Sequence, residues 1–118
     1  MKTVLVVDDD SVMRTILNRV LVKGGHQVLL AGNGVDALQV AEKAVPDLIL
    51  LDEQMPVMNG SELVRLLRER MSRVPPIILI GGEASQADLE TLGVAGLAPK
   101  PFDADALLEL VSRLLGLR

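Results

Sequence analysis

A chain of 118 residues is long enough to form one domain with a sizeable core, and its 49% hydrophobic content argues against disorder. The formal net charge of -4 offers no broad basic surface, so we expect no nucleic-acid binding by this domain. Because cysteine is absent, disulfides and thiolate sites are excluded, and any metal must bind through oxygen or histidine ligands. We interpret residues 1–118 as a single domain.

The first apolar run, residues 3–7, ends at Asp8 and is too short for a signal peptide or a membrane-spanning helix. We therefore expect a cytoplasmic protein that does not enter a membrane. The only histidine, His26, stands in the polar turn between Lys23 and Gln27. We expect it to be a solvated loop residue and assign it no role.

Short β-branched runs alternate with amphipathic segments along the chain, a rhythm typical of a parallel sheet covered by helices on both faces. The gaps between the expected strands should be filled by helices. We expect strands at residues 3–7, 27–31, 47–51, 77–80 and 96–99. Pro99 lacks a backbone N–H, which an edge strand tolerates better than a central one, so the fifth strand is expected at an edge.

The first and last helices have the clearest patterns. Asp10 or Ser11 is expected to cap the first helix, and Asp103 or Asp105 lies near the positive end of the last one. Residues 85–92 are expected to form the weakest helix, which is short and has few large apolar residues. Apolar side chains at helical spacing predict continuous buried stripes, formed in the first helix by Val12, Met13, Ile16, Leu17, Val20 and Leu21 and in the last by Ala106, Leu107, Leu110, Val111, Leu114 and Leu115.

Acidic residues follow two of the expected strands, and a lysine follows another. Asp8 and Asp9 come directly after the first strand, and Asp52 comes after the third. Lys100 follows the fifth strand. Because the carboxyl ends of parallel strands lie at one edge of a sheet, where ligands bind in open α/β folds, we expect these side chains to converge.

Carboxylates gathered in this way need a compensating charge. Two of them about 5 Å apart repel by roughly 3 kcal/mol at an effective dielectric constant of about 20. A bound Mg²⁺ ion is the simplest remedy, since it prefers hard oxygen ligands, and Lys100 would add positive charge. Asp52 is then the best-placed nucleophile toward a phosphoryl group. The structural alternative is that Asp9 and Asp10 cap the first helix and Asp52 caps a turn.

The order and spacing of these motifs resemble the receiver domain of bacterial two-component response regulators over essentially the whole chain. Asp8-Asp9 resembles the acidic metal-binding pair of that family. Asp52, in the sequence Asp-x-x-Met-Pro-x-x-Asn-Gly, resembles its phosphoacceptor, and Lys100-Pro101-Phe102 resembles its Lys-Pro motif. Residues 31–38 resemble the junction of its second strand and second helix.

The resemblance implies a flavodoxin-like (βα)5 fold, in which a five-stranded parallel sheet of order 2-1-3-4-5 carries helices on both faces. It also implies the ligands of the site. Mg²⁺ would be held by Asp9, Asp52 and the backbone carbonyl of Gln54, while Asp8 would assist through water. Lys100 would contact the phosphate, and its peptide bond to Pro101 would be cis.

The function that follows from the resemblance is that of a phosphoacceptor in a two-component phosphorelay. A sensor histidine kinase or a histidine phosphotransfer protein would donate the phosphoryl group of a phosphohistidine to Asp52. The domain would catalyse only its own phosphorylation and dephosphorylation. The signal would then pass through protein–protein contacts to an output protein that the sequence does not identify.

The chain departs from the family pattern in its switch region. Receivers usually carry Ser or Thr after the fourth strand, where the hydroxyl binds the phosphoryl group, but this chain has Gly81. Leu97 stands where the family usually has an aromatic switch residue. The stretch from Gly81 to Lys100 is also about three residues shorter than in a typical receiver. These differences predict a weak or unconventional conformational response to phosphorylation.

Three alternatives remain open at this point. The departures favour a degenerate receiver that binds partners independently of phosphorylation. Asp8 and Asp10 also fit the Asp-x-Asp nucleophile motif of haloacid-dehalogenase-like phosphatases, although Lys100 follows Asp52 rather than preceding it. A flavodoxin is disfavoured because Phe102 is the only aromatic residue, so no Tyr or Trp can stack on a flavin.

Overall fold

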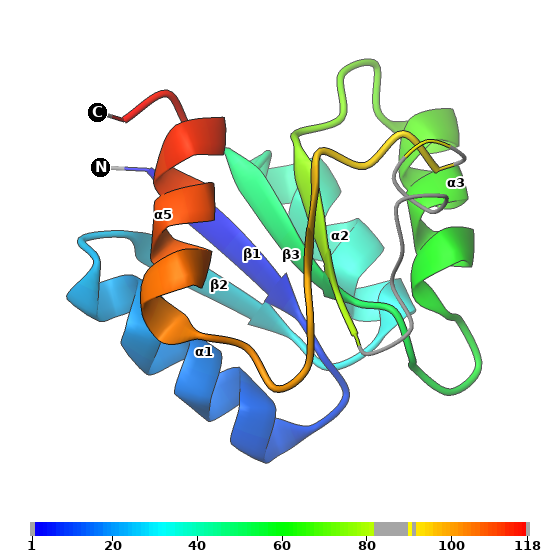
Figure 1. Ribbon diagram of the computed structural model, residues 1–118. Helices are drawn as coiled ribbons and strands as arrows, with labels where there is room; N and C mark the ends of the chain where they lie inside the picture. Colours follow the sequence, from blue (N-terminus) through cyan, green and yellow to red (C-terminus); the bar gives the residue numbers. More distant parts are fainter. Residues whose placement is uncertain (1, 82–89, 91, 118) are drawn as a thin grey trace.

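The structure, a computed structural model, describes residues 2–81, 90 and 92–117 (Figure 1). Five parallel strands form one sheet in the order β2-β1-β3-β4-β5, which confirms the expected topology. The edge position of the fifth strand is also confirmed. The strands are β1 (Thr3–Val7), β2 (Gln27–Ala31), β3 (Leu48–Asp52), β4 (Ile77–Ile80) and β5 (Gly96–Ala98).

Two strand boundaries differ from the prediction. Asp52 belongs to β3 and pairs with Ile80 of β4, whereas Asp47 lies outside the strand. The Asp47 carboxylate instead accepts a hydrogen bond from the N–H of Thr3 at 2.8 Å. Pro99 lies just after β5, where its missing N–H removes no bond from the sheet.

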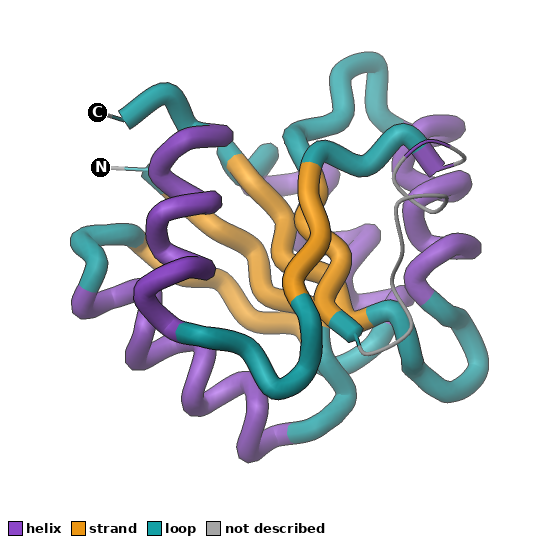
Figure 2. Tube along the Cα trace, in the orientation of Figure 1, coloured by secondary structure: helices purple, strands orange, loops and turns teal. Residues whose placement is uncertain are grey.

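The helices cover both faces of the sheet (Figures 1 and 2). One face packs against α1 (Ser11–Lys23) and α5 (Ala104–Leu114), and the other packs against α2 (Gly34–Ala44) and α3 (Gly60–Arg70). The helix expected at residues 85–92 falls mostly outside the described residues. No helix in the described part of the chain is long and apolar enough to span a membrane.

The buried stripe of α1 is narrower than the sequence pattern predicts. Leu17 and Leu21 are buried, but Val12 and Ile16 are 65% and 42% exposed. Leu17 and Leu21 are four residues apart and face the sheet. Ile16 directly precedes Leu17, and Val12 lies four residues before Ile16, so these two side chains share a face that is rotated away from the sheet. The expectation of a continuous buried stripe was therefore wrong for these two residues.

The expectation that His26 is solvated was also wrong, since this residue is 6% exposed. The turn after α1 is a Schellman motif, in which the N–H of His26 donates to the Leu21 carbonyl at 3.1 Å and that of Gly25, with φ 91°, donates to Val22 at 2.9 Å. This pattern folds the residue after Gly25 back under the helix. His26 is thereby buried beside the last turn of α1.

The two ends of the chain lie away from the acidic residues. β1 begins, and α5 ends, at the amino-terminal edge of the sheet (Figure 1). Asp8 and Asp52 lie at the opposite edge, where the parallel strands end. The fold therefore separates the chain ends from the candidate site.

Candidate functional site

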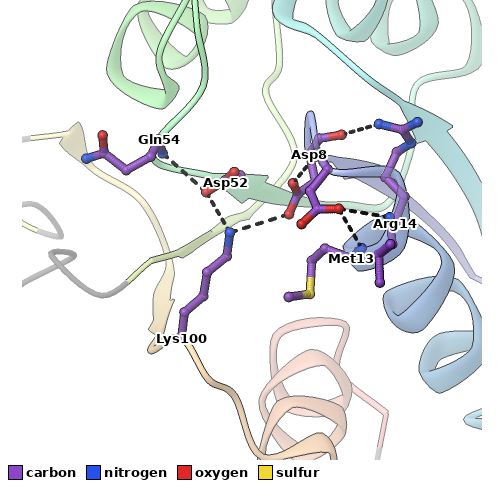
Figure 3. A network of polar contacts seen from close by, with 8 residues as sticks. Asp8, Met13, Arg14, Asp52, Gln54 and Lys100 are labelled. Atoms are coloured by element: carbon purple, nitrogen blue, oxygen red, sulfur yellow. Dashed lines mark hydrogen bonds and ion pairs between the residues drawn. The ribbon is translucent and has the colours of Figure 1, made fainter.

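The carboxyl ends of the strands bring Asp8, Asp52 and Lys100 together (Figure 3). The ammonium of Lys100 lies 3.2 Å from Oδ1 of Asp52 and 3.6 Å from Oδ2 of Asp8. The side chains of Asp8 and Asp52 are only 1% and 3% exposed, whereas that of Lys100 is 30% exposed. One cation therefore bridges two buried acids, as the order of strand ends predicts.

The loop after β1 is shaped by its own aspartates. The N–H of Asp8 donates to the Ala31 carbonyl at 3.1 Å and so extends the pairing of β1 with β2. Oδ1 of Asp8 accepts the N–H of Asp10 at 2.9 Å, and Asp10 in turn caps α1 by accepting the N–H of Val12 at 2.9 Å. The capping alternative is therefore correct for Asp10, while Asp8 is directed into the site.

The loop after β3 is held closed by its backbone. The N–H of Glu53 donates to the Ile80 carbonyl at 3.0 Å, and the Glu53 carbonyl accepts the N–H of Gly60 at 3.2 Å. Asn59 forms a capping box with Glu62 at the start of α3. These bonds fix both ends of the loop that follows Asp52.

Gln54 contacts Asp52 through its backbone N–H, which donates to Oδ1 at 3.2 Å (Figure 3). The expected role of the Gln54 carbonyl as a metal ligand stays a prediction. Oδ1 of Asp52 therefore has two donors, Gln54 and Lys100, which restrict the orientation of the carboxylate. Such restriction suits a group that must meet an incoming ligand in one geometry.

The oxygen atoms of Asp8, Asp9 and Asp52 suit a hard divalent cation. One carboxylate oxygen from each residue lies within 4.8 Å of the others. Oδ2 of Asp8 is buried and accepts no hydrogen bond from the described residues, although Lys100 lies 3.6 Å away. An oxygen cluster with a buried acceptor of this kind fits Mg²⁺, which binds one or two carboxylates and retains several waters.

The pKa of Asp52 lies above its ordinary value because burial disfavours the charged form and the neighbouring charge of Asp8 adds to that effect. Lys100 and the N–H of Gln54 act in the opposite direction without cancelling the rise. Burial lowers the pKa of Lys100, but the hydrogen bond to Asp52 and the charges of both aspartates raise it by more. Lys100 is thus held in its cationic form.

Part of the β3–α3 loop is strained and exposed. Val57 has φ 69° and is fully exposed, a conformation that is rare for a β-branched residue and typically costs about 1 to 3 kcal/mol. The next residue, Met58, packs where a Cβ on Gly34 would be, since that atom would lie 2.9 Å from Cγ of Met58. The loop is thereby joined to the start of α2.

Gly81 and Leu97 stand at the two positions where receivers usually carry switch residues. Gly81 is buried, and its N–H donates to the Ala98 carbonyl at 3.0 Å. A Cβ at this position would lie 3.2 Å from the Cβ of Glu53. Leu97 is half-buried in β5 and packs against the core on the side of α2 and α3. The peptide bond between Lys100 and Pro101 is cis, as the resemblance implied.

Arg14 was missed by the sequence analysis. Its Nη1 donates to the backbone carbonyl of Asp8 at 2.7 Å (Figure 3). The only signal available in the sequence was a basic residue in the early part of the helix that follows the acidic loop. Such a residue is usually solvated, so its contact could not be inferred without the fold.

Comparison with known proteins gives matches over nearly the whole chain. The chain is 35% identical to sporulation initiation phosphotransferase F of Bacillus subtilis over 117 residues, which cover 98% of this chain and 94% of that protein. It is also 35% identical to response regulator protein FleR of Pseudomonas aeruginosa, but spans only 24% of the length of FleR. Most of the length of FleR therefore lies outside the region that matches this chain.

Among solved structures, the receiver domain of a sensor histidine kinase from Pseudomonas aeruginosa has a magnesium ion coordinated in its active-site cleft. It matches this structure with a TM-score of 0.86 and 32% sequence identity, and 98% of each chain is covered. The family model described as response regulator receiver domain matches residues 4–112. The chain therefore belongs to the family of receiver domains of two-component signalling systems.

Proposed function

We propose that Asp52 is the phosphoacceptor of this receiver and takes its phosphoryl group from the phosphohistidine of a sensor histidine kinase or a histidine phosphotransfer protein. The observation that carries this proposal is the pairing of the buried Asp52 carboxylate with the Lys100 ammonium at 3.2 Å. A carboxylate is a competent nucleophile toward phosphorus when nearby cations hold the phosphoryl oxygens.

In the transfer, an oxygen of the Asp52 carboxylate attacks phosphorus and forms the new P–O bond. The P–N bond of the phosphohistidine breaks, its electron pair stays on the imidazole nitrogen, and that nitrogen takes a proton from solvent. Lys100 lies beside Asp52 and would contact an oxygen of the transferred group. The two donors on Oδ1 hold the carboxylate in one orientation during the attack.

We assign the metal ligands to Asp9, Asp52 and the backbone carbonyl of Gln54, with Asp8 contributing through water. The convergence of three carboxylates supports this assignment. When bound, Mg²⁺ supplies positive charge that offsets the acids and holds phosphoryl oxygens as their charge shifts. The domain would catalyse only its own phosphorylation and, with water as the attacking group, its own dephosphorylation.

Exposed apolar side chains at the same edge support docking of the phosphohistidine protein there. Val12 and Val35 are the second residues of α1 and α2, and Val57 lies in the loop after Asp52. These three residues are 65%, 55% and 100% exposed. A phosphohistidine can reach Asp52 only if its carrier covers this edge, so these side chains would be buried in the complex.

The test is phosphoryl transfer from acetyl phosphate and from a histidine kinase, with Mg²⁺ and with EDTA. We expect Mg²⁺-dependent labelling of the wild type and loss of labelling in Asp52→Asn. Labelling should be retained in Glu109→Gln, which also removes one negative charge but at an exposed position. Labelling that survives Asp52→Asn but is lost in Asp8→Asn would overturn the assignment and favour the dehalogenase-like chemistry instead.

A second candidate is a receiver that binds its partner independently of phosphorylation. The observation favouring it is Gly81, which offers no hydroxyl to the phosphoryl group at the end of β4. Equal affinity of wild type and Asp52→Ala for an output partner, together with no labelling from any donor, would make this the better account.

A further inference from the structure

The β1–α1 loop, which carries Asp9, is held from one side by Arg14. Nη1 of Arg14 donates a hydrogen bond to the backbone carbonyl of Asp8 at 2.7 Å (Figure 3). That carbonyl belongs to the planar peptide unit that joins Asp8 to Asp9. The bond therefore restrains the orientation of the backbone from which the Asp9 side chain departs.

The guanidinium of Arg14 lies against the turn after β2. A Cβ on Gly32 would lie 3.1 Å from Nη1 and 3.5 Å from Cζ of Arg14, so the glycine leaves room for this group. Arg14 is half-buried, and its own N–H donates to the Asp10 carbonyl at 2.9 Å in the first turn of α1. The side chain thus joins the start of α1, the end of β1 and the turn after β2.

We propose that Arg14 is a positioning residue for the magnesium site and that it holds the Asp8–Asp9 peptide so that the Asp9 carboxylate faces Asp52. This inference rests on the proposed function, because it takes Asp9 as a ligand of Mg²⁺. A hydrogen bond from a charged donor is stronger than one between neutral groups, which suits this role. Mutation of a residue that orients a metal ligand typically lowers metal affinity by about 10- to 100-fold.

The charge of Arg14 and its positioning of the Asp8–Asp9 peptide have opposite effects on the affinity for Mg²⁺. The direction in which the affinity changes on mutation therefore distinguishes the two effects. A cation close to the acidic cluster repels Mg²⁺, and removing that charge alone would strengthen Mg²⁺ binding. Losing the bond to the Asp8 carbonyl would weaken Mg²⁺ binding instead. Arg19, an exposed arginine on the same helix, offers a matched control for the change in net charge.

The experiment titrates MgCl₂ into isotope-labelled protein and follows backbone amide shifts, with the melting temperature measured without Mg²⁺. We expect Arg14→Gln to raise the Kd for Mg²⁺ about tenfold. Gly32→Ala should raise the Kd as well, because the added Cβ displaces the guanidinium. Arg14→Lys keeps the positive charge and can still donate a hydrogen bond, but it lacks the planar guanidinium, so it should recover part of the loss. Arg19→Gln should stay within about twofold of the wild type, as expected for an exposed, screened charge.

Unchanged or tighter Mg²⁺ binding by Arg14→Gln would overturn the positioning role. Asp9→Asn separates this outcome from failure of the proposed function. If Asp9→Asn binds Mg²⁺ as the wild type does, the assignment of the metal site is wrong. If Asp9→Asn loses binding while Arg14→Gln retains it, only the role of Arg14 is refuted. Should Arg14→Gln fail to fold, Gly32→Ala, which retains the arginine, decides the question.

Discussion

A Cβ on Gly81 would lie 3.2 Å from the Cβ of Glu53, closer than ordinary van der Waals contact between carbon atoms. Glu53 has little freedom to move away, because its N–H is bonded to Ile80 and its carbonyl to Gly60. The missing side chain at the end of β4 and the placement of Glu53 are therefore coupled. Restoring the family's usual hydroxyl in this chain would require an adjustment at a second residue.

Gly81→Ser is expected to lower the free energy of unfolding by about 1 to 3 kcal/mol, as overpacking of a filled site does. In the Glu53→Gly background the opposing Cβ is gone, so the same substitution should cost less. Urea denaturation of the four proteins in this double-mutant cycle measures the coupling. Additive effects of the two substitutions would contradict it.

The wild type is expected to respond weakly to beryllofluoride, a mimic of the phosphoryl group. One hydrogen bond to a charged group contributes about 1.5 to 3 kcal/mol, which is comparable with the few kcal/mol that separate two conformations. Without a hydroxyl at Gly81, amide shifts in residues 92–100 should therefore be small, and they should grow in Gly81→Ser with Glu53→Gly. Large shifts in the wild type would refute this prediction, and Asp52→Asn controls for binding outside the site.

Asp52→Asn is expected to stabilise the metal-free protein at neutral pH. Burial and the charge of Asp8 raise the folded-state pKa of Asp52 above its ordinary value of 3.8. The unfolded chain therefore releases this proton at a lower pH than the folded protein does. As a result, stability that is present below the unfolded-state pKa is lost as the pH rises through the folded-state pKa. The amide removes this loss, so Asp52→Asn should be more stable than the wild type near neutrality, and the difference should disappear in acid.

Thermal melts in EDTA across this pH range measure that difference. Glu109→Gln, which also removes one negative charge but at an exposed position, is the matched control for the change in net charge. A lower melting temperature for Asp52→Asn at neutral pH would show that the carboxylate is net favourable beside Lys100.

Lys100→Gln removes the cation that bridges the two buried acids. We expect the pKa of Asp52 to rise further and the free energy of unfolding at neutral pH to fall by about 1 to 3 kcal/mol. The loss should shrink in acid, where protonation of Asp52 removes the repulsion. Carbon-detected titration of the Asp52 carboxyl group follows the pKa directly. If Asp52→Asn fails to restore stability in this background, the repulsion between the acids is not the cause.

Val57→Ser is expected to slow transfer from a histidine kinase by about fivefold, because loss of a buried contact at an interface commonly costs about 1 kcal/mol. Transfer from acetyl phosphate should be unchanged, because this donor needs no docking surface. Val45→Ser is a close control, since Val45 is 59% exposed and has φ 44° but lies at the opposite edge of the sheet. Equal slowing with both donors would place the effect on the loop around Asp52 rather than on docking.

The strands could be predicted from local chemistry, and the convergence of the acids followed because the carboxyl ends of parallel strands lie at one edge of a sheet. Runs such as residues 48–51 are apolar on both faces, and the first polar residue after them marks the strand end. The strand order came from the resemblance, since alternation of strands and helices alone does not fix which strands are neighbours. Boundaries shifted by one residue at β3 and β5 because terminal pairing depends on the neighbouring strand.

The errors arose where tertiary packing decides the outcome. Helical spacing placed Val12 and Ile16 in a buried stripe, but the helix contacts the sheet along a narrower line. The turn containing His26 reads as polar, yet its Schellman geometry folds that residue inward. Arg14 and Val57 carry no motif, so the contacts of Arg14 with Asp8 and Gly32 and the positive φ of Val57 could not be inferred from the sequence.

The position of the chain ends has a practical consequence for assays. Both ends lie at the edge of the sheet opposite Asp52 (Figure 1). A fluorescent protein, affinity handle or surface anchor fused at either end would therefore stand on the far side of the molecule from an approaching donor. Immobilised or labelled forms should report binding and phosphoryl transfer with the acidic edge left open to solution.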